Sequence, residues 1–146
     1  DAAITTLKIG ADQVTVPVFS RVDGTLNLST TMTSVAEAVI NSEGSPVVVD
    51  FTAVARVGNY EIVDTTYHGN ISVEVRRGGT LIYSRVLIES GGNTFSDYIK
   101  ATANIQFQDN SPGTGDVTYT IKAKESSSSA VGQISYRNLL LLGVKR

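Results

Sequence analysis

The sequence lacks the residues on which most metal and nucleophile chemistry depends. Among its 146 residues there is no cysteine and no tryptophan, and there is a single histidine, His68. Without cysteine there can be no disulfide, no thiolate nucleophile, no zinc–thiolate site and no iron–sulfur cluster. One histidine also excludes a histidine metal cluster. We therefore expect no metal and no cofactor, and a chain of this length can fold around an ordinary hydrophobic core.

A strong charge of either sign and a long hydrophobic run are also missing. Twelve basic and 14 acidic residues give a net charge of −2. This charge argues against a nucleic-acid partner, because proteins that bind nucleic acids neutralise the phosphates with a basic surface. The longest apolar run is Leu139–Leu142, far short of the ~20 residues that cross a membrane. We expect neither nucleic-acid binding nor membrane insertion.

β-Branched residues are abundant: Val, Ile and Thr make up 45 of the 146 residues, a composition that favours sheet. Only Thr33–Ile40 offers a stretch that a helix could use. Apolar and polar residues alternate with period two, as in half-buried strands, in 47–55, 71–76, 99–108 and 117–124. Gly78-Gly79 predicts a tight hairpin, and 133–144 predicts a closing strand. About seven or eight antiparallel strands with regular turns predict a β-sandwich, jelly-roll-like in order.

The N-terminal residues follow a different pattern. Short apolar pieces at Leu7–Ile9 and Val14–Phe19, the second broken by Pro17, predict an extended leader over 1–24 before a sandwich domain over 25–146. The leader is too short to bury its own apolar side, so its sandwich or neighbouring chains must cover it. Together with the run 139–142, this predicts a homotrimer about a three-fold axis. The predicted trimer contacts are Leu7, Ile9, Val14, Val16, Val18, Leu139 and Leu141.

Groups that could carry catalysis are scarce. His68 has no cysteine to pair with, and no G-x-S-x-G elbow occurs in the sequence. Asp109 and Asp116 flank a turn without the ligand spacing of a calcium loop, so a hairpin turn with acidic ends is the simpler interpretation. Glu61 and Asp64 could form a carboxylate pair for glycoside hydrolysis, but they fall in a long polar connection. We expect no enzymatic activity and no catalytic residue.

Several phrases resemble a known family of phage proteins. Segments 2–9 (AAITTLKI) and 13–18 (QVTVPV) resemble a region that precedes the variable C-terminal domain in the host-specificity protein J family, the central tail fibres of lambda-like siphophages. Segments 44–49 (GSPVVV), 75–80 (VRRGGT), 112–119 (PGTGDVTY) and 137–140 (RNLL) resemble C-terminal phage-fibre domains, although the second and third of these also occur in other virion β-domains. The resemblance spans the chain, and no catalytic residue comes with it.

This resemblance implies a homotrimer at the distal end of a phage tail, in the virion, beside other tail proteins. Its implied function is receptor binding, with a glycan, an outer-membrane protein or a pilus protein on the bacterial surface as the receptor. Two alternatives stay open: a trimerising or decoration domain that stiffens a virion fibre without touching the receptor, and a glycan hydrolase, which the residue inventory disfavours. Arg76 and Arg77 are interpreted as solubilising edge charges rather than an anion site.

The order of the connections predicts where a receptor would bind. In an antiparallel sandwich successive connections alternate between the two ends. One end then receives Ser42–Pro46, Gly78-Gly79 and Asp109–Gly115, and the other receives the longer Val57–Gly69, Ser90–Asp97 and Glu125–Ala130. If Leu26–Met32 is also a strand, the leader enters and the C-terminus returns at the end with short turns. The opposite end would then be free to meet the host.

Binding residues usually sit on such loops, where aromatic rings can stack and amides can hydrogen-bond. The predicted receptor contacts are Asn59, Tyr60, Tyr67, His68, Asn93, Phe95 and Tyr98. Two other interpretations remain open: these aromatic side chains cap the core, or the site lies laterally in a cleft between subunits.

Overall fold

The computed structural model describes residues 17–58, 69–90, 98–126 and 131–144, and within these ranges it contains strands and no helix. The strands are β1 (Val18–Val22), β2 (Leu26–Leu28), β3 (Thr33–Glu43), β4 (Val47–Gly58), β5 (Gly69–Arg77), β6 (Thr80–Ser90), β7 (Tyr98–Asp109), β8 (Thr114–Glu125) and β9 (Val131–Gly143). The stretch with helical potential, 33–40, lies in β3, where Ala36, Ala38 and Ile40 are buried in alternation with exposed residues. Period-two burial overrides weak local propensity here.

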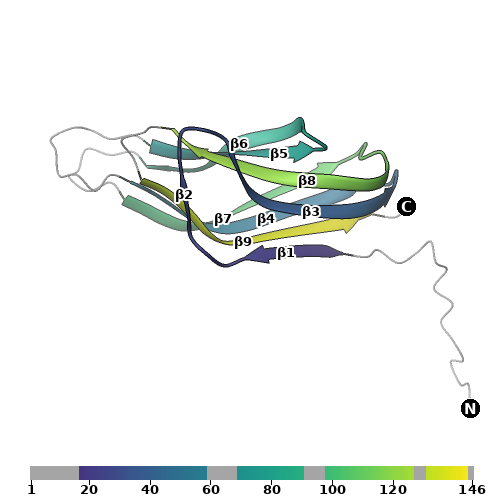
Figure 1. The fold of residues 1–146 in the computed structure, drawn as a ribbon, viewed down its shortest axis with the longest axis horizontal. Helices are drawn as coiled ribbons and strands as arrows, with labels where there is room; N and C mark the ends of the chain where they lie inside the picture. Colours follow the sequence, from purple (N-terminus) through teal and green to yellow (C-terminus); the bar gives the residue numbers. More distant parts are fainter. Residues whose placement is uncertain (1–16, 59–68, 91–97, 127–130, 145–146) are drawn as a thin grey trace, which may run out of the picture.

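Two antiparallel sheets pack face to face (Figure 1). Sheet A has the order β1-β9-β4-β7, with β2 also paired to β9, and sheet B has the order β3-β8-β5-β6. Because β1 and β2 pair with successive parts of one edge of β9, they act as one interrupted strand. The first strand then pairs with the last, β3 with β8, β4 with β7 and β5 with β6. This nested pairing is that of a jelly roll, so the predicted fold class is confirmed.

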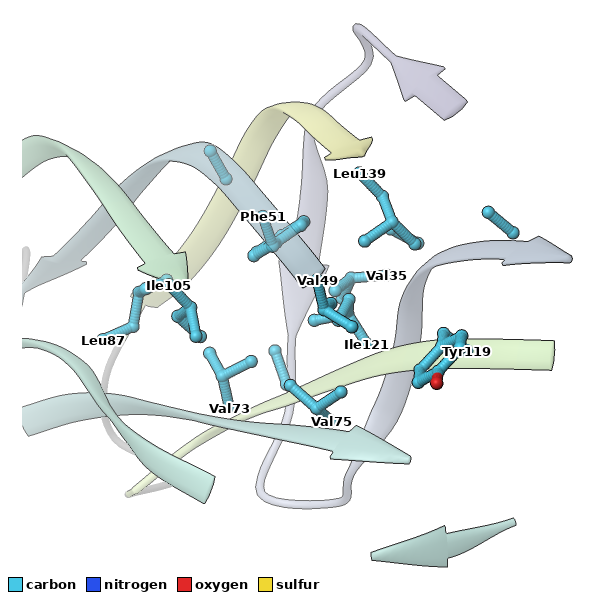
Figure 2. Close-up of a cluster of buried hydrophobic side chains, with 14 of the residues drawn as sticks. Val35, Val49, Phe51, Val73, Val75, Leu87, Ile105, Tyr119, Ile121 and Leu139 are labelled. Carbon is cyan, nitrogen blue, oxygen red and sulfur yellow. The ribbon is translucent and has the colours of Figure 1, made fainter. Parts of the chain in front are cut away.

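The core lies between the two sheets and follows from the alternation along each strand. Val49 and Phe51 of β4 meet Val73 and Val75 of β5 there, and all four side chains are fully buried (Figure 2). Tyr83 of edge strand β6 stacks on Phe107 of edge strand β7, with ring centroids 5.0 Å apart. That pair lies on the side of the sandwich where β7 and β6 are the last strands of the two sheets.

The leucine run in β9 also obeys the alternation. Leu139 and Leu141 are fully buried in the core, whereas Leu140 and Leu142 are half-buried on the outer face of sheet A. This burial corrects the prediction that Leu139 and Leu141 contact another chain, because side chains with no exposed surface have none to share. Of the other predicted trimer contacts, Val18 is half-buried against the same core. Leu7, Ile9, Val14 and Val16 lie outside the described residues.

The described sandwich begins inside the segment predicted as a leader. β1 pairs Val18 with Leu141 and Val22 with Arg137, on the edge of sheet A. Residues 18–22 are thus part of the sheet, and their partner is the closing strand of their own chain. Among the described residues there is no helix long and apolar enough to cross a membrane.

The two ends of the sandwich differ as the strand parity predicts. β1 begins and β9 ends at one end, where Val18 pairs with Leu141 and Val47 pairs with Gly143. This short-turn end also holds the turns 44–46, 78–79 and 110–113 (Figure 1). At the opposite, long-connection end, Gly58 pairs with Tyr98. The strands there lead into the connections 59–68, 91–97 and 127–130.

Candidate functional site

The long-connection end presents a rim of closely held strand ends. Gly58 and Gly69, which bracket the connection 59–68, are both buried. Ser90, with an exposed fraction of 0%, donates its hydroxyl to the Gly69 carbonyl at 3.2 Å and accepts the Gly69 N–H at 3.4 Å. These bonds join the last residue of β6 to the first residue of β5. The scaffold that carries the long connections is therefore fixed at its rim.

A buried carboxylate belongs to the same rim. Glu125, at the end of β8, has an exposed fraction of 1% and accepts the Ser126 N–H at 3.0 Å. A Cβ on Gly132 of β9 would overlap the Glu125 carboxylate, so only glycine allows the side chain to lie against that strand. Glu125 was predicted to begin the connection Glu125–Ala130, whereas it is the last residue of β8. Tyr119, Ile121 and Ala123 are buried at every second position of β8, and Glu125 continues this alternation, so its side chain points inward.

Of the predicted receptor contacts, only Tyr98 is among the described residues. It begins β7, and its backbone pairs with Gly58 at the long-connection end. The remaining six, Asn59, Tyr60, Tyr67, His68, Asn93 and Phe95, lie outside the described residues, in connections whose flanking strands end at this rim. The candidate carboxylates Glu61 and Asp64 lie outside them as well.

The short-turn end is held by a buried ionic cluster around Asp109. This carboxylate, with an exposed fraction of 5%, accepts bonds from Arg77 Nη1 at 2.8 Å, from the Tyr119 hydroxyl at 2.8 Å and from the Ser111 N–H at 3.1 Å. Arg77 also donates to the Ser111 carbonyl. The guanidinium is therefore a structural partner of the β7–β8 turn, which corrects its interpretation as a solubilising edge charge.

This cluster is already satisfied by protein donors. Burial, followed by the hydrogen bond and the charge of Asp109, raises the pKa of Tyr119 above its ordinary value of 10.0, so the phenol stays protonated and donates. Asp116 accepts a bond from Asn41 Nδ2 at 2.8 Å. Within the described ranges no group of three or more His, Asp or Glu residues could hold a metal ion. The cluster therefore links β5, β7 and β8 through their side chains.

A third region, the outer face of sheet A, has features that local sequence patterns do not reveal. Two exposed aromatic side chains belong to this sheet: Phe19 is 60% exposed and Tyr136 is 54% exposed. Between them along β9 lies Asn138, which pairs with Thr52 of β4, and Thr52 pairs with Asn104 of β7. A row of neutral polar side chains thus crosses three strands. Only the register of the strands brings these residues together.

Comparisons with known proteins yield structural likenesses alone. No family model matches the chain, and no curated protein matches it. The chain is similar to the structure of T=1 particles derived from infectious bursal virus, with 12% identity and a TM-score of 0.48 over 86% of this chain and 31% of that chain. It is similar to dimeric latent PorU from Porphyromonas gingivalis, with 11% identity and a TM-score of 0.46 over 88% of this chain and 13% of that chain.

A further likeness, to infectious bursal disease virus of the Gt strain, has 10% identity and a TM-score of 0.43 over 86% of this chain and 32% of that chain. The chain therefore spans about a third or less of the length of each of these three structures. Two of the three are viral and one is bacterial. Because one fold carries many functions, likenesses this distant carry no argument about function.

Proposed function

We propose that the chain is the receptor-binding domain of a phage tail fibre or tail tip, which attaches the virion to a bacterial surface. The domain acts at the distal end of the tail, as a homotrimer beside other tail proteins, and carries out no catalysis. The proposal is supported by the resemblance of segments 2–9 and 13–18 to lambda-like tail-tip proteins. It is also supported by the jelly-roll order of the strands.

The observation that carries the proposal is the polarity of the sandwich. β1 begins and β9 ends at the short-turn end, so the rest of a fibre would join the domain there. The three longest connections after β3 leave from the opposite end, where Gly58, Gly69 and Ser90 hold the rim. A rigid scaffold that presents long connections away from its attachment point suits recognition.

A second candidate, a structural domain that stiffens a fibre, is favoured by an apolar cluster on the outer face of sheet A. Phe19, 60% exposed, pairs with half-buried Leu140, and next to them half-buried Leu142 pairs with half-buried Val48. Packing against a neighbouring chain would cover this cluster, since exposed apolar patches mark interaction surfaces. In that case the lateral face, and not the end, would carry the function.

Binding of the labelled chain to intact bacteria distinguishes the two candidates. The domain should bind a subset of strains in a strain panel. The double variant Tyr60→Ala/Tyr67→Ala should lose that binding by roughly tenfold or more, because rigid aromatic anchors dominate such contacts. Leu81→Ala, which removes an exposed side chain next to the β5–β6 turn at the other end, is the matched control and should bind normally.

Light scattering first establishes that each variant keeps the oligomeric state of the parent chain. Unchanged binding by the double variant in an intact oligomer would move the receptor site away from the long-connection end. No binding to any strain, with a stable trimer, would favour the structural candidate.

A further inference from the structure

Strand β9 contains a bulge at which a tyrosine adopts a backbone conformation that tyrosine disfavours. Thr52 of β4 pairs with Asn138 and Val54 pairs with Ser135, so Ala53 lies opposite both Tyr136 and Arg137. Tyr136 has a φ of 48°, and it is the non-glycine residue with positive φ among the described residues. Side chains with a Cβ are strained in this left-handed region, which glycine occupies freely.

Packing does not explain why a tyrosine occupies this position. The side chain of Arg137 takes the inward place, where it donates to the carbonyls of Val35 at 3.2 Å and Gly24 at 3.1 Å. The Tyr136 side chain is 54% exposed and lies outside the core. A glycine would relieve the strain and keep the bulge. Strained residues that the fold does not need are typical of functional positions.

Polar side chains with free bonding capacity lie beside this tyrosine. The Asn138 amide donates to the Tyr136 carbonyl at 3.1 Å, which keeps the two residues together. Across the sheet, Asn104 Nδ2 donates to Asp50 Oδ1 at 2.6 Å and to Thr52 Oγ1 at 3.0 Å. These bonds hold the row in place and use only the Nδ2 group of Asn104. Within the described part of the chain, no protein group donates to its Oδ1.

The outer face of sheet B has charged side chains where the row on sheet A has amides and a hydroxyl. Its exposed and half-buried positions include Glu37, Glu74, Arg76, Lys122 and Lys124, and it carries no exposed aromatic side chain among the described residues. Two of its carboxylates are already bonded, Glu37 to the Thr120 hydroxyl at 3.0 Å and Glu74 to Arg76 at 2.8 Å. The three residues of the row on sheet A are neutral, and its charged neighbours are already bonded: Asp50 accepts from Asn104, and Arg21, which pairs with Asn138, is bonded to Asp23.

We propose that Tyr136, Asn138, Thr52 and Asn104 form a binding site for a neutral glycan on the outer face of sheet A. A pyranose ring has an apolar face of C–H groups that suits an aromatic ring and a rim of hydroxyls that both donate and accept. Amide and hydroxyl side chains offer both functions as well. Asp50 orients Asn104 and can accept from a sugar hydroxyl. The site is lateral and independent of receptor binding at the long-connection end.

The test is a titration of the full chain with three neutral probes, maltohexaose, cellohexaose and N-acetylchitohexaose, each up to about 10 mM, the range of weak single-site recognition. Side-chain amide NMR signals report on Asn104 and Asn138. At least one probe should shift these signals in a saturable way. Tyr136→Gly should keep the fold and weaken binding by roughly tenfold, as should Asn104→Ala. Thr120→Ala on sheet B, the matched control, should change nothing.

The proposal is overturned if none of the three probes shifts either amide signal at the highest concentration. It is also overturned if binding survives both Tyr136→Gly and Asn104→Ala unchanged, since a ligand held elsewhere would not depend on them. Because the Tyr60→Ala/Tyr67→Ala variant keeps every residue of this row, it should bind the probes normally. A failure of the cell-binding experiment therefore leaves this test standing, and the reverse is also true.

Discussion

The two ends of the sandwich are closed in different ways. The short-turn end contains all of the positive-φ glycines among the described residues, Gly44, Gly78, Gly79, Gly113 and Gly115. It also contains the Asp109 cluster, which ties β5, β7 and β8 together. At the long-connection end the strand ends are held by buried side chains placed against backbone, Ser90 on Gly69 and Glu125 beside Gly132. The backbone conformation of the turns closes the first end, whereas the packing of buried side chains secures the strand ends at the second.

Removing the Asp109 carboxylate should have the largest effect on stability. Asp109→Ala leaves Arg77 and the Tyr119 hydroxyl without their partner in a buried site, and the free energy of unfolding should fall by about 3–5 kcal/mol. Urea denaturation measures this change. Asp116→Ala, which removes an exposed carboxylate bonded to Asn41, should change the same quantity by less than about 1 kcal/mol. Equal losses would mean that the cluster does not secure this end.

The rim of the opposite end is tested by Gly132→Ala. Its Cβ would overlap the Glu125 carboxylate, so a buried side chain must move, and we expect a loss of about 1–3 kcal/mol. The loss should be smaller when Glu125 has been replaced by alanine, because the carboxylate oxygen that lies closest to the new Cβ is then gone. A double-mutant cycle by urea denaturation measures the coupling. Additive losses would show that the two residues do not act on each other.

The difference in the free energy of unfolding between the parent chain and Tyr119→Phe, a variant of the short-turn end, should depend on pH. At neutral pH the variant should lose about 1–2 kcal/mol with the hydrogen bond to Asp109. Burial raises the pKa of Tyr119 in the folded chain above its ordinary value of 10.0. The stability that this group contributes is therefore complete below pH 10.0. It declines above that pH, because the phenol then ionises more readily in the unfolded chain than in the folded chain. The parent chain should therefore lose stability more steeply than Tyr119→Phe above about pH 10.

The two proteins are compared by urea denaturation at a series of pH values. Their difference in unfolding free energy should narrow with rising pH. A constant difference into the alkaline range would show that Tyr119 has the same pKa in the folded and unfolded chains.

The smallest expected effect concerns the turn glycines. Gly79 has a φ of 87°, so Gly79→Ala should lower the free energy of unfolding by about 1 kcal/mol although no atom obstructs the new Cβ. Gly24→Ala, at an open position without positive φ, is the matched control and should lie within about 0.5 kcal/mol of the parent. Thermal unfolding with both variants separates backbone strain from a general effect of replacing glycine.

Local patterns were sufficient for the parts of the fold in which neighbours in sequence decide the structure. Gly78-Gly79 predicts the β5–β6 turn because two successive positive φ values suit glycine, and Arg77 pairs with Thr80 across it. Alternation predicts β7 and β8 because the period of the pleat equals the period of burial. The same alternation implies that Leu139 and Leu141 face inward, although the run of four leucines invited a subunit contact.

Long-range pairing decided the rest. Nothing local shows that Arg77 meets Asp109, 32 residues away, and the bulge that strains Tyr136 follows from the register between β9 and β4. Composition and period-two alternation by themselves determined an antiparallel sandwich, its turn positions and the ends to which its connections run. The tertiary structure alone decided that residues 18–22 join sheet A and that Asn138, Thr52 and Asn104 form one row. Burial preference acts on each residue separately, whereas strand register is a property of two distant segments at once.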